Sequence, residues 1–104
     1  MSIRIWEGST RWSDSDSYYN YLQKTGVKEY RQTTGNHGVY VLRRNVDDRS
    51  EFLLLSLWDS IESIKGFAGS DYEKAVFYPE DAKYLVKFDK HVKHYELLSS
   101  DLKI

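Results

Sequence analysis

The segment Phe52–Trp58, with the sequence FLLLSLW, is apolar in both directions in which a strand points its side chains. Successive residues of a strand face opposite sides of the sheet, and a sheet with one face in water normally alternates polar and apolar residues. One row is entirely aliphatic, and we expect it to face the helices of the domain: Leu53, Leu55 and Leu57. The other row is mixed, and we expect it on the second face of the sheet: Phe52, Leu54, Ser56 and Trp58.

The second face is expected to gain apolar side chains from neighbouring strands, namely Trp6, Tyr40 and Leu42. Monomers rarely expose an apolar patch of more than a few hundred Å2. Burying these side chains would contribute on the order of 10 kcal/mol, against an association cost of ~4–15 kcal/mol. These magnitudes favour a homodimer in which two sheets meet on their second faces and enclose a barrel-like space.

The periodicity along the chain predicts one α+β domain over residues 1–104. The expected strands are Ile3–Gly8, Val39–Arg43, Phe52–Trp58 and His91–Leu98. The expected helices are a first helix around Tyr18–Thr25 with a further turn to Tyr30, then Asp59–Ala68, with Asp59 as its cap, and Pro79–Lys87. This order matches the ferredoxin-like arrangement, a four-stranded antiparallel sheet with helices on one face. Gly35-Asn36-His37-Gly38 predicts a turn, and Asn45–Glu51 predicts a hairpin connection.

The composition argues against several classes of function. Fifteen basic and sixteen acidic residues give a formal net charge of -1, whereas a nucleic-acid-binding domain usually carries a basic face. The chain contains no cysteine, which excludes disulfides and cysteine-based zinc sites and favours a reducing compartment. No segment approaches the ~20 apolar residues of a membrane helix. We therefore expect a cytoplasmic protein that binds neither nucleic acid nor membrane.

Three stretches in and directly after the segment Phe52–Glu96 carry a resemblance to a known family: SLWDSIESIKGFAGSD, AVFYPEDAKYL and VKHYEL. The glycine-rich turn that leads into VYVLRR also matches. The chain resembles the antibiotic biosynthesis monooxygenase (ABM) family of dimeric α+β barrels. The resemblance implies a small aromatic or quinone-forming substrate that is oxidised with O2 without metal or flavin. In that chemistry the deprotonated substrate itself gives electrons to oxygen, and the protein binds a flat molecule, stabilises its anion and handles a proton.

The same resemblance suggests catalytic candidates. Trp58 occupies the Trp of the family's strand-to-helix junction and is expected as a wall or hydrogen-bond donor of the cavity, or else as a core residue. His94 could act as a general base because histidine titrates near neutral pH; the alternative is a histidine hydrogen-bonded within the dimer core. Arg44, or Arg43 if the strand slips by one residue, could anchor the substrate anion or end the strand in solvent.

The expected substrate-binding side chains share an apolar or aromatic character: Trp6, Tyr40, Leu54, Phe67 and Tyr78. Each of the aromatic walls could equally be plain core packing. His37 lies in a turn and is expected on the surface.

Metal and haem are not expected. Haem-degrading relatives place their iron-binding histidine on the second helical region, whereas the predicted helices here contain none. His91 and His94 are three residues apart near a strand, so they should point to opposite faces. No cofactor is therefore predicted. The alternative to an oxygenase is a non-catalytic dimeric barrel that binds a small hydrophobic ligand or serves an accessory role.

Overall fold

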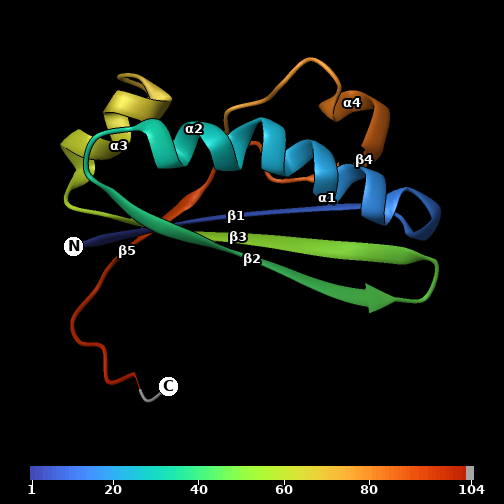
Figure 1. Cartoon of the computed structure of the whole chain (residues 1–104), viewed down its shortest axis with the longest axis horizontal. Helices are drawn as coiled ribbons and strands as arrows, with labels where there is room; N and C mark the ends of the chain where they lie inside the picture. Colours follow the sequence, from blue (N-terminus) through green and yellow to red (C-terminus); the bar gives the residue numbers. More distant parts are fainter. Residues whose placement is uncertain (103–104) are drawn as a thin grey trace.

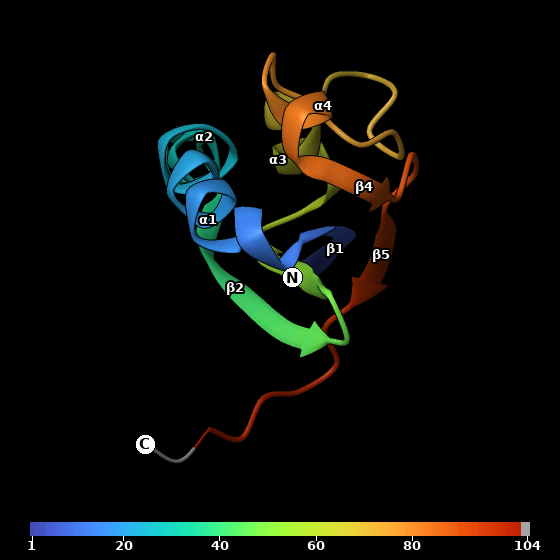
Figure 2. The ribbon, with the colours of Figure 1, turned by 90° about the vertical axis from the view of Figure 1, so that its right-hand side faces the viewer.

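The computed structural model describes residues 1–102. Its sheet is antiparallel, with the strand order β2-β3-β1-β4 and with β5 also paired to β1. The strands are β1 (Ser2–Arg11), β2 (Asn36–Val46), β3 (Arg49–Trp58), β4 (Leu85–Phe88) and β5 (Lys93–Glu96). The helices are α1 (Ser15–Lys24), α2 (Gly26–Gln32), α3 (Ile61–Ala68) and α4 (Asp81–Tyr84), preceded by a 3-10 turn at Trp12–Asp14. All four α-helices lie on one side of the sheet, and the C-terminal segment runs out on the other (Figures 1 and 2). The ferredoxin-like α+β prediction is confirmed.

The sheet is apolar on both faces, but our assignment of the two rows of β3 is reversed. Phe52, Leu54, Ser56 and Trp58 are buried beneath the helices, and the row of Leu53, Leu55 and Leu57 is only half-buried on the other face. Alternation defines two rows but not which row is inside. The bulkier row lies inside because aromatic rings from α1 and α2 pack edge-on against it, Tyr18 on Phe52 and Tyr30 on Trp58.

Trp6 also lies on the helix side, contrary to our prediction for the second face. Its ring lies over Gly8, where a Cβ would come within 2.4 Å of the indole. Gly8 therefore permits the close approach. The indole Nε1 donates to the carbonyl of Asp89 at 3.0 Å, which joins β1 to the segment after β4.

The second face, here called the outer face, is formed by side chains that no helix covers. Tyr40 and Leu42 of β2 are 55% and 49% exposed, as predicted for this face. Their cross-strand partners are Leu55 and Leu53, and Ile3 and Ile5 of β1 stand opposite Leu57 and Leu55 on the neighbouring strand pair. The outer face is consequently a continuous apolar surface across three strands.

The β2–β3 hairpin is longer and its turn tighter than the sequence predicts. The strands run on to Val46 and restart at Arg49, so that only Asp47 and Asp48 form the turn. Asp47 has φ 55, a left-handed conformation that aspartate tolerates.

The C-terminal half departs most from prediction. Helix α4 covers only Asp81–Tyr84 of the predicted helix Pro79–Lys87, and Leu85–Phe88 pairs with β1 as a strand. The expected strand His91–Leu98 shortens to Lys93–Glu96. At α3 the cap is Ser60, whose hydroxyl accepts from the Ser63 amide, and not Asp59. Among residues 1–102, no helix combines the length and apolarity that crossing a bilayer requires.

Candidate functional site

A small cavity lies between the helices and the inner face of the sheet. It is lined by one arginine, one aspartate and a mainly aromatic wall: Arg4, Trp6, Tyr18, Leu22, Gly26, Tyr30, Leu54, Phe67, Val76, Tyr78, Asp81 and Val92. Its volume of about 30 Å3 has room for one or two water molecules. We call it the interior cavity. Trp6, Leu54, Phe67 and Tyr78, which the sequence proposed as substrate-binding residues, all line it.

Arg4 is a buried cation without an anionic partner in the described residues. It comes from the inner row of β1 and is 1% exposed. Its Nη1 donates to the carbonyl of Tyr72 at 2.6 Å and its Nη2 to that of Lys74 at 3.1 Å. Nε has no hydrogen-bond partner, and the Phe67 ring lies below the guanidinium at 5.7 Å. Burial lowers the pKa of Arg4, yet arginine stays charged in proteins.

His94 lies against Arg4 from β5. Its Nε2 is 3.2 Å from Arg4 Nη1, and because a guanidinium can only donate, Nε2 must accept. Burial first, and then the charge of Arg4, lower the pKa of His94. The imidazole is therefore neutral at neutral pH and helps to orient the guanidinium.

Asp81 brings a carboxylate to the same cavity. It is the first residue of α4 and is only 7% exposed. Its Oδ2 accepts the Tyr78 amide at 2.6 Å, and no ion pair to Asp81 occurs within the part of the chain that the structure describes. Burial raises the pKa of this carboxyl group. The cavity thus holds one unpaired group of each charge.

Tyr78 closes the cavity from the segment that joins α3 to α4. Its ring packs next to Gly26, and its hydroxyl donates to the carboxylate of Glu29 on α2. Burial, followed by this hydrogen bond, raises the pKa of Tyr78. The amide of Glu80 donates to the hydroxyl of Tyr21 at 2.9 Å. These two contacts hold the segment against α1 and α2.

Trp58 and Tyr30 form the aromatic layer beside the cavity. Trp58 is fully buried and is not a lining residue. Its Nε1 donates to the hydroxyl of Ser56 at 2.9 Å, so that its single donor is already used. The Tyr30 ring packs against both Trp58 and Phe67, and burial raises the pKa of its phenol despite the nearby positive charge of Arg4.

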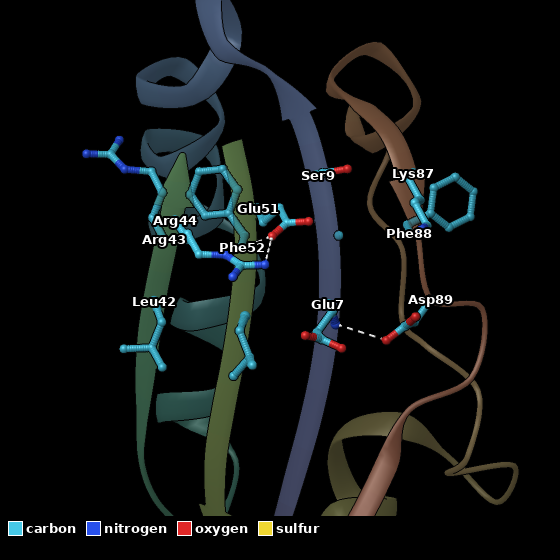
Figure 3. A pocket seen from close by; sticks show the side chains of 12 residues that line it. Glu7, Ser9, Leu42, Arg43, Arg44, Glu51, Phe52, Lys87, Phe88 and Asp89 are labelled. Atoms are coloured by element: carbon cyan, nitrogen blue, oxygen red, sulfur yellow. Dashed lines mark hydrogen bonds and ion pairs between the residues drawn. The ribbon is translucent and has the colours of Figure 1, made fainter. Parts of the chain in front are cut away.

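The remaining predicted residues lie away from the interior cavity. Tyr40 and Arg44 are on the outer face, where Arg44 pairs with Glu51 at 2.6 Å (Figure 3). Arg43 points to the helix side and pairs with Asp16 at 2.8 Å, so the strand has not slipped by a residue. His37, expected on the surface, is exposed and pairs with Asp59.

An open groove of about 440 Å3 lies on the outer face near the hairpin (Figure 3). Its charged lining alternates in sign, with Arg44 beside Glu51 and Lys87 near Glu7 and Asp89. The amide of Glu7 donates to the Asp89 carboxylate at 3.2 Å. This groove is large enough for a ligand, and within it Arg44 pairs with Glu51, whereas no ion pair is formed by Lys87 or Glu7 with the described residues. Its charged side chains lie at an open surface, whereas Arg4 and Asp81 of the interior cavity are buried.

Sequence reasoning missed Arg4, Asp81 and Tyr30. Arg4 lies between two apolar residues of a strand, in a pattern that reads as a solvent-facing position. The available signal was that its strand neighbour Trp6 is on the same row, because residues i and i+2 share a face. In the described residues, no group of three or more His, Asp or Glu side chains could hold a metal ion.

The family model described as antibiotic biosynthesis monooxygenase matches residues 22–77. No curated protein matches the chain.

Solved structures share the fold at low sequence identity. A protein from Bacillus cereus described as a proposed antibiotic biosynthesis monooxygenase has a TM-score of 0.70 and 16% identity, covering 98% of this chain and 97% of its own. One from Nitrosomonas europaea with the same description has a TM-score of 0.66 and 12% identity, covering 95% and 100%. A mutant of MhuD with two manganese protoporphyrin IX molecules bound per active site has a TM-score of 0.63 and 11% identity, covering 99% and 100%.

Proposed function

Because the chain belongs to the antibiotic biosynthesis monooxygenase family, we propose that it is a cofactor-independent monooxygenase whose interior cavity takes a small aromatic or quinone-forming substrate. One oxygen atom of O2 would enter the substrate as a carbonyl and the other would leave as water. The four electrons required come from the substrate, whose methylene group becomes the carbonyl.

The observation that carries this proposal is the unpaired guanidinium of Arg4. A buried charge is costly, and a buried ion normally has a partner of opposite sign. Arg4 instead has two carbonyls, one neutral imidazole and a free Nε. A substrate phenolate or enolate would supply the missing negative charge. In a site shielded from water, such a preorganised cation stabilises a developing anion strongly.

Substrate entry requires movement of the segment that carries Tyr78. The interior cavity is too small for an aromatic ring, whereas ligand sites typically measure ~300–1,000 Å3. Tyr78 fills the space next to Gly26 and is held by one hydrogen bond to Glu29. Displacement of this side chain would open the cavity between α2 and the segment before α4.

The outer face supports a second part of the proposal, a homodimer. The face is apolar across β1, β2 and β3 and carries no helix. A second copy of the chain would cover it with an identical surface, as is usual for a two-fold symmetric dimer. The interior cavity would remain within each protomer on the helix side.

The test uses anthrone, the keto form of a hydroxyanthracene. Purified protein in air should consume one O2 per anthrone and form anthraquinone, with one atom of 18O2 in the product by mass spectrometry. Arg4→Met should lower kcat/KM by about 100-fold or more, as expected for loss of an oxyanion-stabilising group. The exposed Arg31→Met is the matched control and should retain full activity.

Two results would contradict the proposed function. Rates no higher than autoxidation without protein would contradict it directly. Tight anthrone binding without O2 uptake would favour the non-catalytic ligand-binding barrel.

A further inference from the structure

We propose that Asp81 is the base that removes a proton from the substrate, while Arg4 holds the oxyanion that forms. This inference rests on the proposed function and adds to it the residue that accepts the proton. Both groups line the interior cavity. Arg4 belongs to β1 of the sheet, and Asp81 belongs to α4 on the helix side of the sheet. The cavity therefore contains both a cation that can stabilise an anion, Arg4, and a carboxylate that can accept a proton, Asp81.

Asp81 has the capacity to accept a proton. Only one of its carboxylate oxygens is engaged, Oδ2, which accepts the Tyr78 amide at 2.6 Å. Oδ1 has no hydrogen-bond partner in the described residues, and no lysine, arginine or histidine pairs with the group there. A carboxylate that is 93% shielded from water and lacks a cation is a stronger base than an exposed one.

The charged and titratable groups around Asp81 support this assignment. Tyr18 of α1, Tyr30 of α2 and Tyr78 are phenols whose pKa values are raised by burial, so they remain neutral at physiological pH. Among the described residues, Arg4 is the only cation that lines the cavity. Burial raises the pKa of Asp81 toward the range in which a general base works best.

His94 is less suited to the role that the sequence suggested for it. The Nε2 lone pair faces the guanidinium of Arg4 at 3.2 Å and is therefore engaged. Protonation would place two positive charges side by side, and burial and Arg4 both lower the pKa of the imidazole. His94 acts as a positioning residue for Arg4 in this scheme.

The proposed substrate must be a weak acid whose conjugate base is an oxyanion that Arg4 can pair with. Anthrone, the aromatic ketone of the proposed function, has this property because its ring methylene is acidic. The C–H bond breaks, the proton goes to Oδ1 of Asp81, and the electron pair moves through the ring to the carbonyl oxygen. That oxygen, now negative, pairs with Arg4, and no oxidant is required for this step.

The step can be measured without oxygen. Anthrone is incubated anaerobically in D2O with the protein, and loss of the methylene proton signal is followed by NMR. The wild-type protein should accelerate exchange well above the buffer rate. Asp81→Asn keeps an acceptor for the Tyr78 amide but cannot take a proton, and it should reduce the enzymatic exchange rate by about 100-fold, within the range for loss of a general base. Glu80→Gln, at the exposed neighbouring position, should exchange at the wild-type rate.

A pH profile of the wild-type protein gives a second measurement that needs no variant. The exchange rate should rise through a single ionisation above the ordinary aspartate value of 3.8. The proposal would be overturned if Asp81→Asn exchanged at the wild-type rate, or if the wild-type protein did not accelerate exchange. It would also be overturned if His94→Gln lost the exchange activity while Asp81→Asn kept it. Exchange that depends on Asp81 without subsequent O2 uptake would support the base and contradict the oxygenase.

Discussion

At the scale of single residues, the most unusual position is Arg4. Its guanidinium is supported by carbonyls of Tyr72 and Lys74, which lie about 70 positions further along the chain. These carbonyls belong to the segment before α4, so the charge also fixes that segment. The guanidinium is consequently preorganised before any ligand arrives, and little reorganisation is needed when an anion forms.

His94, which lies beside Arg4, should make the stability of the fold depend on pH. In the folded protein the pKa of His94 is lowered from 6.5, so the unfolded chain takes up a proton first as the pH falls. The contribution of the neutral His94 to the free energy of unfolding is therefore fully present above about pH 7. It decreases as the pH falls through the pKa of this histidine in the unfolded chain, in the direction that proton linkage requires. Urea unfolding between about pH 5 and 8 measures this slope. His94→Gln should flatten it, and exposed His91→Gln should leave it unchanged; equal slopes in all three proteins would contradict the cause.

At the scale of elements, the strands near the centre of the sheet could be predicted from the sequence, and the reason is visible in β3. Its double apolar row identifies a strand whatever its orientation. The row that faces the helices could not be predicted, because alternation is symmetric and only packing against Tyr18 and Tyr30 decides it. The prediction therefore exchanged the residues of the two faces. Trp6 and Leu54 lie on the helix side, and the row that lies on the outer face is Leu53, Leu55 and Leu57.

The region after α3 could not be predicted for a different reason. Helical spacing is present at Ala82, Leu85 and Val86. The segment Leu85–Phe88 nevertheless forms backbone hydrogen bonds with the free edge of β1. Local propensity is a weak preference that tertiary pairing overrides. The predicted site contained the aromatic wall but neither of the two unpaired charges, since no local pattern signals a buried ion.

The segment before α4 should control access to the cavity. Tyr78→Phe keeps the ring and removes the hydrogen bond to Glu29, which contributes about 0.5–1.5 kcal/mol. We expect the association rate of anthrone to rise between about twofold and tenfold, with a small change in melting temperature. Stopped-flow fluorescence under argon measures the rate, and Tyr19→Phe on the exposed side of α1 is the control. An unchanged association rate would show that entry does not depend on Tyr78.

At the scale of the whole molecule, the sheet divides two functions between its faces. The inner face contributes the cavity, and the outer face contributes an apolar surface that the chain leaves uncovered. On that surface Tyr40 lies opposite Leu55, and Leu42 lies opposite Leu53. Burying large apolar side chains on it contributes about 1.5–3 kcal/mol each, which a two-fold dimer gains twice.

A single charge on this surface should separate the protomers. Leu55→Lys places an ammonium group opposite Tyr40 and Ile5, where burial in a dimer would leave it without a partner. Sedimentation velocity should show a dimer mass for the wild-type protein and a monomer mass for this variant. Lys28→Leu on the exposed side of α2 is the control and should remain dimeric. A wild-type monomer mass at every concentration would contradict the dimer.

The edge of the sheet next to β1 is divided between two short strands. β4 pairs with β1 at Gly8–Thr10 and β5 pairs at Ser2–Ile5, so neither contributes a long ladder. Such short ladders open at a lower free energy than the long β2–β3 hairpin. Amide protons of β4 and β5 should consequently exchange with solvent through local unfolding, whereas those of β3 should exchange only through global unfolding. This edge can consequently open while the cooperative unit that holds Trp58 in place stays folded.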